Sequence, residues 1–159
     1  MTDAARFRIA LYQPDIAGNT GAILRLGACL GVGVDIIGPT GFDISDRNLK
    51  RAGMDYLEIA SLTRHDDWSA FEAWRANTGR RLVLLTTGAV ASHAAYAFSA
   101  HDVLLFGRES AGVPDHVHAA ADARLRIPMP GGGRSLNLAM CVAIAAGEAM
   151  RQTEPTWTT

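Results

Sequence analysis

The segment "IPMPGGGRSLNLAM", residues 127–140, places three polar side chains directly after a run of three glycines. These side chains are Arg134, Ser135 and Asn137. Glycines leave room for a ligand to touch backbone amides and carbonyls, and the polar residues that follow can line a pocket. The segment therefore indicates a binding site in which main-chain groups hold a small molecule.

Two further loops carry little side-chain bulk: "LTTG", residues 85–88, and "FGRESAGVP", residues 106–114. Like the segment 128–135, each of them continues an apolar run that is typical of a strand. The chain has no G-x-x-x-x-G-K-[ST] sequence, and "GNTGAILRLG", residues 18–27, does not match the dinucleotide-binding fingerprint in the required place. We therefore expect a nucleoside-type ligand held by loops, and not a polyphosphate held by a P-loop.

Strand-like and helix-like segments alternate along the chain, which predicts an α/β fold with a parallel sheet and helices on both faces. In such sheets, ligands bind outside the carboxyl ends of the strands, where the three loops lie. The predicted strands are 7–13, 34–41, 81–88, 102–109 and 123–130, and the predicted helices are 18–31, 43–56, 65–80 and 136–152. The expected helix N-caps are Asn19 or Thr20, Ser45 or Asp46, Asp66 or Asp67, and Ser135 or Asn137, of which Ser135 fits well. The expected helix ends are Gly31 with Gly33, and Gly79.

Length, composition and charge narrow the classes of protein to which the chain can belong. With 159 residues, 48% of them hydrophobic and 19% charged, we expect one globular domain, residues 1–159, with the last few residues loosely ordered. No apolar run is long enough to cross a bilayer and the N-terminus has no signal-peptide pattern, so we expect a cytoplasmic protein with Cys29 and Cys141 reduced and buried. The net charge of −1 means that a nucleic-acid partner needs a local basic patch, and the spacing of the histidines predicts no metal site.

Five segments together resemble, in order and spacing, the SPOUT superfamily of RNA methyltransferases that use S-adenosyl-L-methionine (AdoMet). These are "NTGAILRLGA", "GFDISDRNLKRAGMDY", "TRHDD", "LLFGRESAGVP" and "RIPMPGGGRSLNLAMCVAIAAGEAMRQ", so the resemblance covers about residues 8–152. More narrowly, the chain is similar to the small tRNA 2′-O-methyltransferases that modify the wobble nucleotide, a cytidine or a modified uridine, of leucine tRNAs. The resemblance implies a C-terminal trefoil knot, a homodimer, a tRNA partner, and S-adenosyl-L-homocysteine as the product of the cofactor. The loop "PGGG" departs from the bulkier residues of close relatives.

The resemblance also assigns roles to residues. It implies a catalytic set of Arg25, Glu109, Ser135, Asn137 and Asn19, and it implies cofactor contacts from Leu85, Gly107, Ile127 and Ser135, with the adenine near the first three. From the residues alone, Arg25 is a solvated helix arginine, Asn19 and Ser135 are helix caps, and Glu109 is solvated or pairs with Arg108. An arginine stays protonated at ordinary pH, so we expect Arg25 to orient the phosphate or the 2′-hydroxyl more than to act as a base.

A basic helix face is the candidate RNA contact. Arg47, Lys50 and Arg51 are spaced i, i+3 and i+4, which places them on one face of the predicted helix 43–56. Such a run is usually a solvated face, but the resemblance makes it a candidate RNA-binding patch together with Arg134, and Arg6 and Arg8 are possible additions.

The last helix predicts an assembly. From Leu138 to Met150 it carries one charged residue, Glu148, and a helix that is apolar all round must be buried on every side. A second copy of the chain is the simplest cover, and Arg25 is the candidate that one copy donates to the site of the other. Two alternative functions remain: a related SPOUT 2′-O-methyltransferase that acts on another RNA such as ribosomal RNA, and a nucleoside-binding module without turnover.

Overall fold

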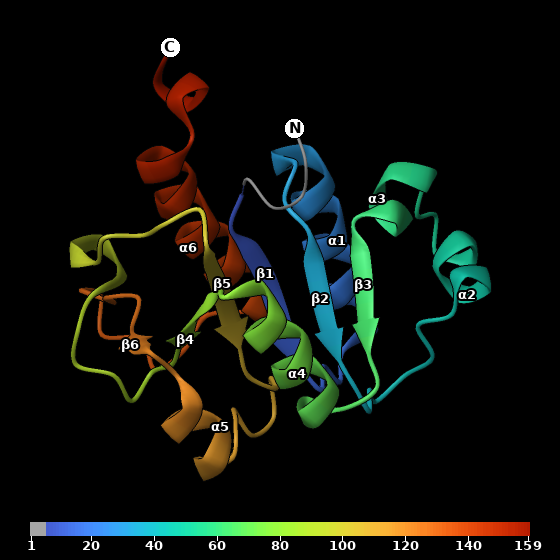
Figure 1. Cartoon of the computed structure of the whole chain (residues 1–159), viewed down its shortest axis with the longest axis horizontal. Helices are drawn as coiled ribbons and strands as arrows, with labels where there is room; N and C mark the ends of the chain where they lie inside the picture. Colours follow the sequence, from blue (N-terminus) through green and yellow to red (C-terminus); the bar gives the residue numbers. More distant parts are fainter. Residues whose placement is uncertain (1–5) are drawn as a thin grey trace.

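Six parallel strands form one sheet in the order β3-β2-β1-β5-β4-β6 (Figure 1). The computed structural model describes residues 6–159. The strands are β1 (Arg8–Tyr12), β2 (Val34–Ile37), β3 (Leu62–His65), β4 (Arg81–Leu85), β5 (Asp102–Phe106) and β6 (Ala123–Leu125). The helices are α1 (Ala17–Leu30), α2 (Asp46–Arg51), α3 (Tyr56–Ala60), α4 (Trp68–Thr78), α5 (Asp115–Ala120) and α6 (Leu138–Thr153), with two 3₁₀ turns, η2 (His93–Ala95) and η3 (Pro155–Thr158).

Helices cover both faces of the sheet, which confirms the predicted α/β architecture. Alternate strand residues point to opposite faces, so the two faces have separate apolar cores. One core packs β1, β2 and β5 residues against α1 and α6, and the other packs the alternate residues against α4 and α5. Figure 1 shows α4 and α5 in front of the sheet and α1 and α6 behind it.

Most expected helix ends are confirmed. Ser45 caps α2, Asp67 caps α4, and Gly31 and Gly79 end α1 and α4 in the left-handed conformation. The predicted helix 43–56 is wrong in its length, because it divides into α2 and α3 around Gly53, which has a φ of 87°.

The expected cap of α1 is wrong, and at the start of α6 the less favoured of the two candidates is the cap. The N-cap of α1 is Ile16, which forms no side-chain cap, so Asn19 and Thr20 lie inside the first turn. The N-cap of α6 is Asn137 and not Ser135: its side-chain oxygen accepts a hydrogen bond from the Ala139 backbone N–H at 2.9 Å. This change matters for the site, because it frees the Ser135 hydroxyl from a capping role and fixes Asn137 at the start of the helix.

The expected burial of the two cysteines is wrong, whereas the expected uncovered face of helix α6 is found. Cys29 is exposed and Cys141 is half-buried, although both are free thiols as expected. Helix α6 is not buried on every side within one chain: Val142 and Ala145 are buried, whereas Met140 and Ile144 are 60% and 41% exposed. The helix therefore presents an apolar face that the described residues leave uncovered.

Arg8 is not available to RNA, because it is 2% exposed in a charged cluster beneath α4. Its Nε lies 2.6 Å from Asp35 Oδ2, and His65 Nε2 lies 2.8 Å from the other oxygen of the same carboxylate. The guanidinium also lies over the Trp74 ring, 5.4 Å from its centroid. Within residues 6–159, no helix is long and apolar enough to cross a membrane.

Candidate functional site

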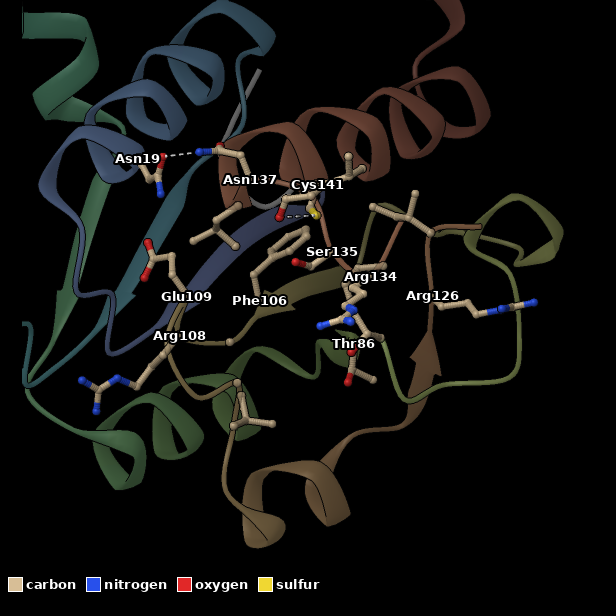
Figure 2. Close-up of a pocket in the computed structure, with 18 of the residues that line it drawn as sticks. Asn19, Thr86, Phe106, Arg108, Glu109, Arg126, Arg134, Ser135, Asn137 and Cys141 are labelled. Carbon is tan, nitrogen blue, oxygen red and sulfur yellow. Dashed lines mark hydrogen bonds between the residues drawn. The ribbon is translucent and has the colours of Figure 1, made fainter. Parts of the chain in front are cut away.

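A cavity of about 530 Å³ opens at the carboxyl ends of β4, β5 and β6 (Figure 2). Its walls are the three loops that follow these strands, and the first residues of α1 and α6 complete it. The predicted convergence of the loops 85–88, 106–114 and 128–135 is confirmed, because parallel neighbouring strands must end at the same edge of the sheet.

All four residues predicted to contact a cofactor, Leu85, Gly107, Ile127 and Ser135, line the cavity. Gly107 shows why a glycine stands at its position. A Cβ there would lie 2.6 Å from the carbonyl carbon of Gly112. The two segments come this close because the Arg108 and Gly112 backbones exchange hydrogen bonds of 3.0 and 2.9 Å. The tight turn leaves no room for a side chain at Gly107, so this residue lines the cavity with backbone atoms alone.

Four of the five residues expected to be catalytic line the same cavity: Asn19, Glu109, Ser135 and Asn137. The side-chain nitrogen of Asn137 donates to Asn19 Oδ1 at 3.0 Å, which ties the start of α6 to the start of α1. Figure 2 shows Glu109 on the same side of the cavity as this pair, with its carboxyl group directed toward Asn19.

Arg25, the fifth residue, does not line the cavity of its own chain. Its side chain is 62% exposed and its Nε lies 2.6 Å from Oε1 of the buried Glu58 on α3. Glu58 is held in turn by a reciprocal capping arrangement with Asp55. The hydrogen bond to Glu58 raises the pKa of Arg25 further above its ordinary value, so this guanidinium remains a cation.

Glu109 does not pair with Arg108, as one interpretation of the sequence expected. The nearest charge to Arg108 Nη2 is Asp15 Oδ2, at 3.7 Å, and the Asp15 backbone N–H donates to Glu109 Oε2 at 3.3 Å. Burial is the main cause that raises the pKa of Glu109, and its contact with Asp15 raises it further. The cavity therefore contains a carboxyl group that holds a proton more readily than an ordinary glutamate.

Sequence reasoning missed Asp15, Phe106, Arg126 and Met129. The last three are at or after strand ends already expected to form the site, so their positions along the strands could have indicated them. Asp15 likewise follows a strand end, that of β1, but it does not line the cavity and reaches the site only through its contact with Glu109. Figure 2 shows the Arg126 side chain extending away from the other labelled residues.

The expected RNA-binding residues lie in two places. Arg47, Lys50 and Arg51 are exposed on α2 and form no ion pair with any residue from 6 to 159. Arg134 is exposed on the cavity loop. Helix α2 lies beside β3, at the opposite edge of the sheet from β6 (Figure 1), so one chain does not bring the two groups together.

A doubly covered parallel sheet with a loop-built cavity at its carboxyl edge defines an α/β domain with a candidate small-molecule site where such folds bind their ligands. The sequence profile of the SpoU rRNA Methylase family matches residues 6–147, and the chain belongs to this family. The resemblance to RNA 2′-O-methyltransferases is thereby confirmed.

Relatives and solved structures agree with this assignment. The chain is 56% identical to a tRNA (cytidine(34)-2′-O)-methyltransferase of Beijerinckia indica, over 91% of this chain and 90% of the relative. It is 42% identical to the protein of the same name in Escherichia coli K12, over 91% and 92% of the two chains.

Among solved structures, one described as giving insight into the 2-OH methylation of C/U34 on tRNA has a TM-score of 0.84 and 42% identity, covering 94% of this chain and 97% of the other. An AdoMet-bound rRNA methyltransferase of Sinorhizobium meliloti has a TM-score of 0.80 and 30% identity. The match covers 92% of this chain but only 56% of that one.

Proposed function

We propose that this protein is a methyltransferase that transfers a methyl group from AdoMet to the 2′-oxygen of nucleotide 34, a cytidine or a modified uridine, in leucine tRNAs. The main support for the proposal is that one nucleoside-sized cavity is lined by Asn19, Glu109, Ser135 and Asn137. Relatives named for methylation of cytidine 34 match nearly the whole chain, which supports the same position here.

The cavity suits AdoMet. Leu85, Ile127 and Met129 offer apolar contacts for an adenine, and Gly107, which has no side chain, offers main-chain groups. When bound, AdoMet supplies an electrophilic methyl group on a sulfonium, whose departure as a neutral thioether requires no metal. No group of three potential metal ligands occurs within the part of the chain that the structure describes.

The polar residues have separate tasks in this proposal. The Asn19–Asn137 pair fixes the two helix starts that face the substrate ribose. Ser135, which caps no helix, is available to the cofactor. Arg25 acts as a fixed cation that orients the RNA, and because it lies outside the cavity of its own chain, we propose that it serves the site of a second copy.

We propose that residues 1–159 form one methyltransferase domain with a C-terminal trefoil knot, in which the chain after β6 passes through the loop 86–101. Two contacts of this loop support the proposal. It extends β6, since the His93 N–H donates to the Arg126 carbonyl at 2.9 Å. It is also fastened to α6, because Gln152 accepts from the Phe98 N–H at 2.7 Å and donates to the Tyr96 carbonyl at 2.8 Å.

A cytoplasmic homodimer completes the proposal. The uncovered apolar face of α6, with Met140 and Ile144, suits a second copy. Such a dimer offers a way to bring α2 of one chain, with Arg47, Lys50 and Arg51, to the cavity and Arg134 of the other. This arrangement also accounts for the separation of the two groups within one chain.

Ribosomal RNA is a less suitable substrate. The neighbouring rRNA methyltransferase is matched over only 56% of its length, so much of that protein has no counterpart in this chain. Relatives named for cytidine 34 of tRNA are instead matched over about nine-tenths of their length, which supports a tRNA target here.

Mass spectrometry of nucleosides from tRNA, with and without the gene for this protein, tests the function. We expect the 2′-O-methylated nucleotide 34 of leucine tRNAs to disappear without the gene and to return when purified protein and AdoMet are added. Loss of a methyl group from rRNA alone would establish the second function instead. AdoMet binding with no methylated RNA of any kind would indicate a nucleoside-binding module.

A further inference from the structure

Arg25 is an exposed cation that a buried carboxylate holds in place. Its side chain is 62% exposed, whereas the side chain of Glu58, its partner on α3, is only 5% exposed. Arg25 Nε donates to Glu58 Oε1 at 2.6 Å across 33 positions of sequence, so the bond joins α1 to α3. An exposed arginine ordinarily has many side-chain conformations, and a short charged hydrogen bond to a buried partner restricts them. The conformation of Arg25 is therefore restricted before any RNA binds.

Glu58 is itself held by the start of α3. Its Oε2 accepts from the Asp55 backbone N–H at 2.8 Å, and its own backbone N–H donates to Asp55 Oδ1 at 2.8 Å. The Ser61 hydroxyl donates to the Glu58 carbonyl at 2.8 Å. A glutamine could complete the same capping arrangement, but its single side-chain oxygen could not serve Asp55 and Arg25 together. The carboxylate supplies a second acceptor oxygen, and this oxygen binds Arg25.

The two helices that carry this pair are packed together. Helix α3 lies against α1 (Figure 1). A Cβ at Gly21, one turn before Arg25, would lie 3.5 Å from Met54 Cε, and a Cβ at Gly27 would lie 4.0 Å from Ser61 Oγ. The residues that flank α3 thus lie close to α1 before and after Arg25. The ion pair therefore joins two surfaces that the fold already holds side by side.

The bond to Glu58 uses one edge of the guanidinium and leaves the other nitrogens available. Of the five N–H donors of an arginine, four are on Nη1 and Nη2. These two nitrogens of Arg25 form no hydrogen bond to any residue from 6 to 159. The hydrogen bond to Glu58 raises the pKa of Arg25, so the guanidinium keeps its positive charge. A charged pair of N–H groups with a fixed direction matches two oxygens of a phosphate.

We propose that Glu58 is a positioning residue, which holds Arg25 by its Nε so that Nη1 and Nη2 bind the phosphate beside the target ribose. This inference rests on the proposed methyl transfer, in which Arg25 serves the site of a second copy. The 2′-oxygen must lie close to the methyl carbon and opposite the sulfur, so a small displacement of the RNA slows the reaction. A cation that is held in advance sets the position of the RNA backbone without further ordering of its own side chain.

Nitrogen-15 NMR of arginine side chains in the full chain tests the pair without RNA or AdoMet. Loss of a signal in Arg25→Lys and in Arg47→Lys identifies the two Nε–H groups. We expect the Arg25 Nε–H to exchange with water more slowly than that of Arg47, which is exposed and forms no ion pair within residues 6–159. Glu58→Met keeps the length of the side chain and removes both acceptor oxygens, so it should abolish this protection.

Asp55→Ala is the matched control, because it removes one capping hydrogen bond of α3 but keeps the Glu58 carboxylate and its bond to Arg25. The Arg25 Nε–H should stay protected in this variant. Urea unfolding shows whether each variant is folded. If Glu58→Met does not fold, Glu58→Gln takes its place: glutamine can complete the capping box but lacks the negative charge, so it should reduce the protection.

Single-turnover methylation, with tRNA and AdoMet at saturation, gives the second readout. Displacement of an aligned reactant by about 1 Å can slow a reaction by about 10²-fold, so Glu58→Met should slow methylation by roughly 10- to 100-fold. The AdoMet dissociation constant should not change, and Asp55→Ala should react at nearly the wild-type rate. In an Arg25→Lys background, Glu58→Met should slow the residual reaction by a smaller factor, because lysine has neither the Nε–H nor the planar fork.

The two readouts separate the possible failures. An Arg25 Nε–H that exchanges as fast as that of Arg47, or that stays fully protected in the folded Glu58 variant, would overturn the inference, whether or not tRNA is the substrate. An unchanged rate in that variant, or equal slowing in the wild-type and Arg25→Lys backgrounds, would also overturn it and leave Glu58 a structural role. If the pair behaves as expected in NMR while no tRNA is methylated, the proposed function fails and the Arg25–Glu58 pair remains established.

Discussion

The space around Gly107 is too small for any side chain. A methyl group there would meet the Gly112 backbone at 2.6–2.7 Å, so one of the two segments would have to move. We predict that Gly107→Ala destabilises the protein by about 1–3 kcal/mol, as overpacking does. We also predict that it weakens AdoMet binding at least ~tenfold, which corresponds to about 1.4 kcal/mol.

Calorimetric titration with AdoMet measures the affinity, and urea unfolding measures the stability. Gly131→Ala is the matched control, because a Cβ at Gly131 has no neighbour within 4 Å. The control should keep the affinity and change the stability by no more than about 0.5 kcal/mol. Equal affinities for the two variants would show that the turn at Gly107 does not shape the cofactor site.

Glu148 on α6 makes a stability contribution that depends on pH. Hydrogen bonds from Arg151 and then from Gln152 lower the pKa of Glu148 to about 2. Because this pKa is lower in the folded state, the contribution is complete above the ordinary pKa of a glutamate and is lost as the pH falls toward about 2. We expect Glu148→Gln to cost less than about 1 kcal/mol at neutral pH, since Arg151 is exposed.

Urea unfolding of the wild type and Glu148→Gln at a series of pH values measures this difference. The two stabilities should converge as the pH decreases from about 5 to about 2. A constant difference down to the lowest pH would mean that Glu148 acts through packing and not through its charge.

At the scale of elements, α2 presents three exposed basic side chains, Arg47, Lys50 and Arg51, that form no ion pair with any residue from 6 to 159. We predict that reversing the charge of Lys50 and Arg51 weakens tRNA binding and flattens its salt dependence, while the affinity for AdoMet stays the same. Each lost phosphate contact should reduce the slope of log K against log salt by roughly 0.7–0.9. Filter binding at several salt concentrations measures the slope.

Neutral glutamine replacements of Lys50 and Arg51 serve as the comparison, because they remove the attraction without adding repulsion. They should give the same change of slope with a smaller loss of affinity. If charge reversal leaves both binding and methylation unchanged, the basic face of α2 is only solvated.

The elements that sequence predicts well are those with strong local patterns. Four of the six strands, β1, β2, β4 and β5, are mainly apolar and almost wholly buried in the sheet. Strand β3 was missed because it is a short edge strand, "LTRH", with only one buried residue. Helix α3 was missed because it has only five residues and is separated from α2 by residues 52–55, in which Gly53 has a φ of 87°.

The residues of the candidate site also divide into those that the sequence can place and those that it cannot. Residues at strand ends, such as Leu85, Gly107 and Ile127, could be placed together because parallel strands end at one edge. Sequence could not show that Arg25 pairs with Glu58, or that Asp15 lies beside Glu109. Both contacts join loops or helices that are far apart in the chain and depend on the tertiary fold.

At the scale of the whole molecule, the uncovered face of α6 predicts the assembly. We expect the wild type to sediment at twice its mass of 16.9 kDa. Met140→Glu with Ile144→Glu should sediment as a monomer, because the charges cannot be buried against a second copy. Val90→Glu is the control: Val90 is 91% exposed on the loop 86–101, and its change should leave the dimer intact.

A mixing experiment tests whether the two copies share sites. Chains with Arg25→Ala and chains with Ser135→Ala should each be inactive alone, whereas mixed dimers should regain one intact site. Failure to regain activity would contradict a contribution of Arg25 across the interface. A wild-type monomer of 16.9 kDa that methylates tRNA would contradict the dimer itself.

Because Gln152 holds the loop 86–101, the site can form only late in the synthesis of the chain on the ribosome. The cavity needs residues from Ile16 to Cys141, and the fastening of one of its loops comes from a residue eleven positions later still. Chains are made from the N-terminus at about 5–20 residues per second, so the cofactor site is completed only in the last moments of synthesis. A nascent chain stalled before α6 is therefore expected to hold no AdoMet, and unfinished copies would not sequester the cofactor from finished ones.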